Sequence, residues 1–201
     1  MRLKKLESIL AGMESFATSL DVSAGGTHFY GKISGGDLAF VHKRFAPCTA
    51  SEIEKLKIQM GFSNLGSYED LLLQTDGIIL FNNRITIFGV RENPERSMAL
   101  DKQTSISVSS ALRRRGGNHS EWLPIGAVAL YDIVLDIELN RSGESRLGAP
   151  SLGYVSFSKF VDLLLLVWDS ARALTKPPEI VLPKVDELER VLRSVIRGDR
   201  H

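Results

Sequence analysis

The chain has 201 residues, 43% of them hydrophobic and 24% charged, which is ordinary for a globular protein and enough for one well-buried core. Its 25 basic and 24 acidic residues leave a net charge of +1, which excludes a strong overall attraction to nucleic acid or anionic lipid. One cysteine excludes an intrachain disulfide. No apolar run approaches the ~20 residues that span a bilayer, and none near the N-terminus suits a signal peptide, so we expect a cytoplasmic protein.

The N-terminal part is predicted to form a helix followed by strands. Apolar residues recur at steps of three and four between residues 2 and 20, which is the spacing of an amphipathic helix. Glycine pairs at 25–26 and 35–36 predict turns around a short strand near residues 28–30. A second strand is predicted over residues 38–45.

Two helices are predicted next. Thr49 and Glu52 fit a capping box, in which each side chain accepts a hydrogen bond from a free backbone N–H at the start of a helix. A second helix is predicted from Ser67 to just before Gly77, because glycine suits the left-handed conformation at a helix end.

Strands dominate the middle of the chain. Short apolar stretches at 78–81 and 85–90 flank an Asn-Asn turn and predict returning strands. Residues 91–120 are polar and irregular, and we expect a long loop there. The clearest strand is 131–139, where apolar residues alternate with mostly acidic ones. A hairpin turn is predicted to lead into a partner strand that ends at Tyr154-Val155.

The C-terminal part is predicted to hold two helices. Ser156 is expected to cap an apolar helix that runs to about Leu174 and is broken by the following prolines. A last helix is predicted from Lys184 to Arg197, with acidic residues early and basic residues late, as the helix dipole favours. Strands joined by short turns and covered by helices indicate an α+β fold with a single mixed or antiparallel sheet.

One row of carboxylates is a candidate site. Asp132, Asp136 and Glu138 share one face of the predicted strand 131–139. Two carboxylates on a strand can hold Mg²⁺ in a nuclease, but no adjacent lysine or histidine completes a nuclease set. A solvated outer face explains the same residues. On the functional side, the row could dock a basic partner, and we take it as the candidate partner-binding site.

Cys48 is the other candidate for chemistry. It precedes a predicted helix, where a thiolate would be stabilised. No family-specific signature surrounds it, and nothing in the sequence places His28 or His42 beside it. We therefore predict a structural cysteine, no catalytic residue, no metal site and no cofactor.

Short apolar and glycine patterns follow one another in a fixed order along the chain. They are Ile53-Glu54-Lys55-Leu56 to Gly61, then Tyr68, Leu71, Leu72 and Gly77, then Phe88-Gly89, then Trp122 to Gly126, and last Ser156-Phe157 with Phe160. This order resembles the SUKH superfamily, which includes the fungal cell-wall synthesis regulator and many bacterial immunity proteins. The resemblance implies structural roles for five signature residues, namely Gly77, Gly89, Trp122, Gly126 and Phe157.

The resemblance covers a little over half of the chain and suggests how it is divided. Residues 47–176 would form the SUKH-like core domain. Residues 1–46 would be an N-terminal extension of a helix and strand packed on that core. Residues 177–201 would be a C-terminal extension with an amphipathic helix.

Similarity to this family implies a domain without catalytic residues that binds a protein partner, commonly a toxin domain such as a nuclease or a deaminase. We therefore expect a non-enzymatic immunity protein that neutralises a bacterial toxin domain and binds neither nucleic acid nor membrane. One alternative is a regulatory or scaffold protein of the same fold that binds a host partner. A less favoured alternative is a metal-dependent phosphodiesterase.

Overall fold

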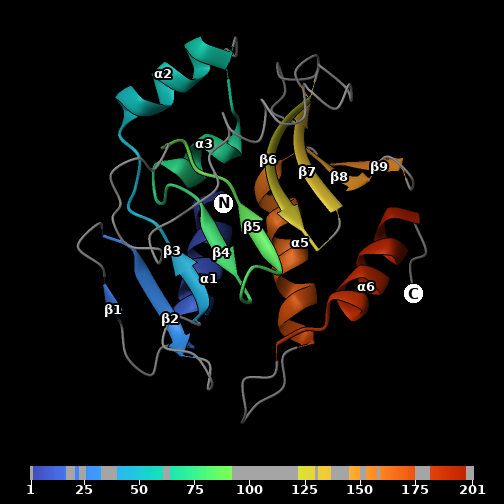
Figure 1. Cartoon of the computed structure of the whole chain (residues 1–201). Coiled ribbons are helices and arrows are strands. Elements are labelled where there is room, and N and C mark those ends of the chain that lie inside the picture. Colours follow the sequence, from blue (N-terminus) through green and yellow to red (C-terminus); the bar gives the residue numbers. More distant parts are fainter. Residues whose placement is uncertain are drawn as a thin grey trace.

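The computed structural model of the chain describes eleven segments. They are residues 2–16, 21–22, 26–32, 40–60, 64–91, 122–129, 131–136, 145–149, 153–157, 159–174 and 182–197. In these segments, nine strands form one sheet and five helices accompany it (Figure 1). The chain is therefore an α+β protein, as the sequence predicts.

Every described strand pairs antiparallel with the next strand along the chain, so the strand order of the sheet is the chain order. The strands are β1 (Asp21–Val22), β2 (His28–Lys32), β3 (Phe40–Arg44), β4 (Ile78–Leu80), β5 (Ile85–Ile87), β6 (Trp122–Val128), β7 (Tyr131–Asp136), β8 (Ser145–Ala149) and β9 (Gly153–Phe157). Antiparallel neighbours can be joined by short turns, as expected from the sequence and as found between β4 and β5, whereas two helices lie between β3 and β4.

The five described helices are α1 (Arg2–Glu14), α2 (Ala50–Met60), α3 (Ser67–Leu72), α5 (Phe160–Ala173) and α6 (Val185–Arg197). Helices α1 and α5 contact each other and lie against the same face of the sheet, and α6 contacts both α5 and β9 (Figure 1). Helix α2 stands at the periphery. No helix in the described segments has the length and apolar character needed to cross a membrane.

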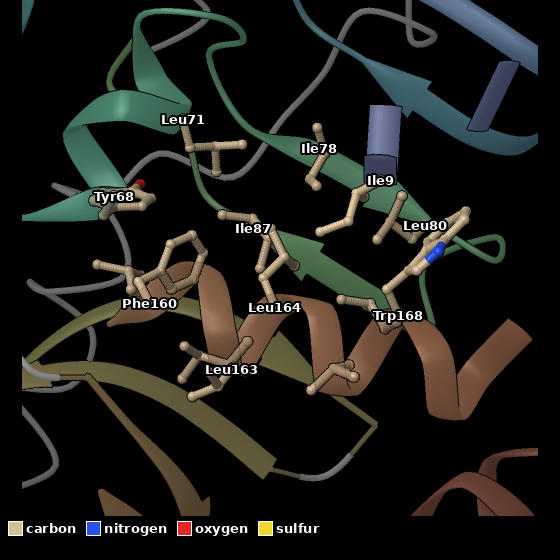
Figure 2. Close-up of a cluster of buried hydrophobic side chains, with 14 of the residues drawn as sticks. Ile9, Tyr68, Leu71, Ile78, Leu80, Ile87, Phe160, Leu163, Leu164 and Trp168 are labelled. Carbon is tan, nitrogen blue, oxygen red and sulfur yellow. The ribbon is translucent and has the colours of Figure 1, made fainter. Parts of the chain in front are cut away.

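The centre of the core lies between α5 and strands β4 and β5. Figure 2 shows side chains from α1, α3, α5 and both strands converging there, among them Ile9, Tyr68, Ile78, Leu80, Ile87, Leu164 and Trp168. The apolar face of α5 supplies Phe160, Leu163, Leu164, Val167 and Trp168, all of them buried. Such burial of one stripe of a helix on one face of a sheet is what stabilises a layered α+β fold.

One continuous core joins the three segments that the sequence suggested. Buried residues at Leu6 and Ile9 of α1, Val41 of β3, and Leu188 and Leu192 of α6 belong to the same cluster as α5. The sheet also spans the proposed boundary at residue 46, since β3, before it, pairs with β4, after it. The boundaries at residues 46 and 177 mark where the sequence pattern changes. Apolar contacts of the single core connect residues on both sides of each boundary.

The start of α5 differs from the prediction. Ser156 does not cap this helix: it lies in β9, opposite Arg146 of β8. The helix begins at Phe160 after Lys159, which makes no side-chain capping hydrogen bond. The backbone N–H of Val161 instead donates to Oγ of Ser67 at 3.2 Å. A serine from α3, distant in sequence, thus satisfies a free backbone group that a local cap would otherwise satisfy.

Two further differences concern strands. The single partner strand predicted to end at Tyr154-Val155 is two strands, β8 and β9, which pair with each other from Ser145–Phe157 to Ala149–Gly153. No secondary structure is predicted for the segment from Trp122 to Gly126, which lies in β6, with an irregular register between Pro124 and Gly126. The predicted long loop lies outside the described residues from residue 92 onward.

Candidate functional site

A buried polar cluster centres on Asp76, which follows α3 and is inaccessible to solvent. Its Oδ1 accepts hydrogen bonds from the backbone N–H of Val90 at 2.5 Å and from Sγ of Cys48 at 3.0 Å. Its Oδ2 accepts from the backbone N–H of Arg91 at 3.3 Å. Both carboxylate oxygens are therefore occupied by groups of the chain itself, as a buried polar group requires.

Arg91 connects this cluster to helix α2. Its Nε donates to Oε1 of Glu52 at 2.7 Å, and its Nη2 donates to Oε2 of the same carboxylate at 3.0 Å. This bidentate pairing, with two charge-assisted hydrogen bonds, is a strong interaction between an arginine and a carboxylate. The guanidinium also donates to the carbonyl oxygen of Pro47 at 2.7 Å. Arg91 thereby fastens the segment after β5 to the start of α2.

The capping box predicted at the start of α2 is confirmed. The backbone N–H of Glu52 donates to Oγ1 of Thr49 at 3.2 Å, and the backbone N–H of Thr49 donates to Oε2 of Glu52 at 2.7 Å. The hydrogen bond from Arg91, assisted by those from Thr49, lowers the pKa of Glu52 to about 2 against the opposing effect of burial. The capping carboxylate is thus also the partner of Arg91.

The environment of Cys48 opposes nucleophilic chemistry. Residue Cys48 is 6% exposed, and its thiol donates to the Asp76 carboxylate. Burial, together with the charge of Asp76, raises the pKa of Cys48 well above its ordinary value. A reactive cysteine needs the opposite, an accessible thiol whose pKa is lowered by positive charge. The geometry favours the structural role expected from the sequence.

His42 lies in the core among aromatic rings. Its ring centroid is 4.7 Å from that of Phe16, 4.8 Å from that of Phe81 and 5.3 Å from that of Trp168. Its Nδ1 accepts a hydrogen bond from the backbone N–H of Phe81 at 3.3 Å, and burial lowers its pKa to about 3. The neutral ring is therefore a packing element on β3, and its Nδ1 is occupied by the backbone N–H of Phe81.

The acidic row on β7 is less open than the sequence suggested. Asp132 is half-buried and takes part in an interaction within the chain. Val134, the next residue on that face, is 1% exposed, so the prediction of a solvated face is wrong at this position. Asp136 ends β7 opposite Trp122. Its side chain and all of Glu138 lie outside the described residues.

No set of three histidine, cysteine, aspartate or glutamate side chains in the described segments has the arrangement of a metal site. The structure brings Asp76 and Cys48 together with Glu52, and the arginine among them satisfies the carboxylates. The three residues of the predicted row are not among this set.

Two of the signature glycines press against β5 from its two sides. Gly77 has a φ of 88°, and a Cβ there would lie 2.7 Å from the carbonyl oxygen of Ile87. A Cβ at Gly126 would lie 2.7 Å from the carbonyl oxygen of Thr86. Gly77 does not end α3, because this helix stops at Leu72. A glycine is required at position 77 because the backbone of β5 lies close to it and because its φ is left-handed.

The other signature residues lie on strands or beside them. Gly89 follows β5, and its backbone nitrogen would be 3.0 Å from a Cβ at Gly77. Phe157 ends β9 and packs, half-buried, against the core. Trp122 begins β6, and its side chain lies outside the described residues. Of the signature glycines, Gly77 and Gly126 therefore have steric roles around one short strand.

The sequence assigned no role to Asp76 or Arg91. Asp76 stands in an ordinary turn signal before Gly77, and Arg91 begins a polar stretch. Their importance depends on three chain segments meeting, which local spacing does not reveal. The one local signal was the capping box, since Glu52 is both a cap and the partner of Arg91.

The chain was also compared with known proteins. No family model matches it, and no curated protein matches it.

Proposed function

We propose that this protein is a non-enzymatic protein-binding module of the cytoplasm, and specifically an immunity protein that neutralises a bacterial toxin domain. The observation that carries the proposal is that, in the described part of the chain, Asp76, Glu52, Cys48 and His42 are engaged in contacts within the chain itself. The order of its sequence patterns, which resembles the SUKH superfamily, supplies the kind of partner.

Each of these four side chains is engaged by neighbouring groups of the chain. Asp76 accepts hydrogen bonds from two backbone N–H groups and a thiol, and Glu52 accepts from Arg91 and from the helix start. Cys48 is buried and its pKa is raised. His42 is enclosed by rings. Together these residues stabilise a scaffold, which suits a protein that acts by presenting a surface.

The proposed docking residues are Asp132, Asp136 and Glu138. A carboxylate row of this kind would face basic side chains of the partner and would contribute mainly to the rate and specificity of association. Because Val134 is buried, the contact surface would be centred on the carboxylates and not on the apolar residue between them.

Co-expression with a toxin domain encoded just upstream tests the proposal. We expect the two proteins to co-purify as a stable complex and the cells to survive expression of the toxin domain. Absence of a neighbouring toxin gene, together with no protection of cells, would contradict the immunity role. A stable complex with a host protein in the absence of any toxin would favour the regulatory alternative.

The docking residues are tested with matched charge changes. The double substitution Asp132→Asn and Asp136→Asn should weaken the complex about tenfold, since it removes two interface charges. The control, Asp169→Asn with Asp186→Asn, removes two exposed carboxylates from α5 and α6 and should change affinity less than about twofold. Equal effects of both pairs would place the interface elsewhere. Mg²⁺-dependent cleavage of DNA or RNA that Asp136→Ala abolishes would instead support the phosphodiesterase.

A further inference from the structure

Helix α2 is attached to the rest of the protein less extensively than the other described helices. The backbones of α1, α3, α5 and α6 each lie against another helix or a strand, whereas α2 has no pairing of comparable extent in the described segments. Figure 1 shows it at the edge of the molecule. Of its eleven residues only Ile53 and Leu56 are buried, whereas α5 buries seven of fourteen. Apolar packing therefore holds α2 more weakly than it holds α5.

Ion pairs attach α2 to the chain at both of its ends. Near the start, Arg91 holds Glu52 through hydrogen bonds of 2.7 and 3.0 Å. In the last turn, Nζ of Lys57 lies 3.4 Å from Oε1 of Glu69 in α3. The side chains of Arg91 and Glu52 are 27% and 33% exposed, and that of Glu69 is 31% exposed. Partly exposed ion pairs each contribute little and are screened by salt, so they can separate without a large cost.

Cys48 is placed to follow any movement of α2. It directly precedes Thr49, which the capping box with Glu52 fixes to the helix. Two hydrogen bonds hold Cys48 to the rest of the chain. Its backbone N–H donates to the carbonyl oxygen of Leu72 at 2.9 Å, and its thiol donates to Oδ1 of Asp76 at 3.0 Å. A displacement of α2 that breaks these two bonds would bring the thiol into contact with solvent.

Asp76 does not depend on α2 for its other hydrogen bonds. The backbone N–H groups of Val90 and Arg91 donate to its carboxylate, and both belong to the segment after β5. The carboxylate therefore keeps two donors when Cys48 leaves. A buried charge that lost all its partners would oppose the movement strongly, and the structure avoids this situation.

We propose that α2 is a hinged helix, which opens as a unit from Cys48 onward while α1, α5 and the sheet stay folded. The ion pairs of Glu52 with Arg91 and of Lys57 with Glu69 control how often it opens. Opening exposes the thiol of Cys48 and the carboxylate of Asp76, so that this cluster alternates between a closed and an accessible state. Local openings of this kind occur in the least packed elements of a protein. The inference is independent of the proposed immunity role.

Reaction of the folded protein with a thiol reagent, at several urea concentrations, tests the opening. Cys48 is the only cysteine, so the label reports on one position. Labelling should be at least about tenfold faster than global unfolding allows, with global unfolding measured separately by urea denaturation. Its rate should depend only weakly on urea, because opening of one helix exposes little surface. A labelling rate and urea dependence that both match global unfolding would overturn the proposal.

Two matched lysine substitutions separate local opening from global unfolding. Lys57→Gln removes the pair with Glu69 and should accelerate labelling about threefold to fivefold. Lys5→Gln removes a partly exposed ion pair of 2.6 Å with Asp162, which joins α1 to α5, and should change the labelling rate less than about 1.5-fold. Equal acceleration by both substitutions would show that labelling follows unfolding of the whole chain, and would also overturn the proposal.

Hydrogen exchange measured by mass spectrometry provides a second readout, which needs no substitution. The amide protons of α2 should exchange through an opening of the same free energy as the labelling of Cys48. They should exchange at least about tenfold faster than the protected amides of α5, because α5 stays folded when α2 opens. Equal protection of α2 and α5 would contradict a hinged α2.

Discussion

At the scale of single residues, the core contains polar groups that are stabilised in different ways. Asp76 is surrounded by donors from Cys48, Val90 and Arg91. The Nδ1 of His42 accepts a hydrogen bond, and its Nε2 is buried with no hydrogen-bond partner in the described segments. Burying an ionised group without a partner is costly, so the histidine is kept neutral, which is why its pKa falls to about 3.

The neutral histidine predicts a dependence of stability on pH. The folded pKa of His42 is about 3 and its ordinary value is 6.5, so between these values the unfolded chain binds a proton that the native state does not. The stability that this residue contributes is complete above pH 6.5 and declines as the pH falls toward 3. The linked slope is about 1.4 kcal/mol per pH unit in the free energy of unfolding.

Urea denaturation of wild-type protein and His42→Gln between pH 7 and pH 5 measures this effect. The pKa of Glu52, about 2 in the folded chain and ordinarily 4.5, lies below this window in both states. The variant should be less stable at pH 7 by about 0.5–3 kcal/mol, and its stability should fall less on acidification. His28→Gln, on the neighbouring strand, serves as the control. If the free energy of unfolding of His42→Gln fell with pH as steeply as that of the wild-type protein, His42 would not be the source of the pH dependence.

At the scale of secondary structure elements, the short strand β5 sets unusual steric demands. Its backbone is approached closely by Gly77 on the β4 side and by Gly126 on the β6 side. A strand of three residues has few hydrogen bonds of its own, so its position depends on close packing of its neighbours. Tyr68 adds to this packing, since its hydroxyl donates to the carbonyl oxygen of Phe88 at 2.5 Å.

Substitution of Gly77 by alanine tests the close approach. Gly77→Ala and Gly26→Ala both place a side chain at a positive φ, of 88° and 76° respectively. The new Cβ would lie 2.7 Å from a backbone oxygen at position 77, but 3.2 Å from the Ala46 Cβ at position 26. Gly77→Ala should therefore lose about 1–3 kcal/mol more stability than Gly26→Ala, measured by chemical denaturation. Equal losses would show that conformation alone requires the glycine.

At the scale of the whole molecule, the N- and C-terminal extensions are parts of one core. Helix α1 contributes Leu6, Ile9, Leu10 and Met13 to the buried cluster, and α6 contributes Leu188 and Leu192. An ion pair of 2.6 Å between Lys5 and Asp162 also joins α1 to α5. Each fully buried apolar side chain contributes about 1.5–3 kcal/mol, whereas a whole domain is stable by only about 5–15 kcal/mol.

The fragment 47–176 is therefore expected not to fold on its own. Far-ultraviolet circular dichroism during heating should show a cooperative transition for the full chain and none for the fragment. Two full-length variants on α1 act as controls. Ile9→Ala removes a buried side chain and should lower the free energy of unfolding by about 2–5 kcal/mol. Glu7→Ala changes an exposed side chain and should lower it by less than about 0.5 kcal/mol. A fragment that melts cooperatively near the temperature of the full chain would support an independent core domain.

Local patterns were sufficient wherever the decisive contacts are close in sequence. The capping box of Thr49 and Glu52, the amphipathic spacing of α1 and α6, and the turn between β4 and β5 each depend on residues within a few positions of one another. The α+β class followed from the sum of such local preferences.

Long-range contacts decided the rest. The start of α5 depends on Ser67, and the role of Glu52 depends on Arg91. Burial of Val134 depends on what covers its face of the sheet, which the alternating pattern of the strand does not specify. The sequence by itself determined the elements and their class, because helix caps and periodicity act over a few residues. Only the tertiary structure decided which polar groups meet, because such contacts join segments distant along the chain.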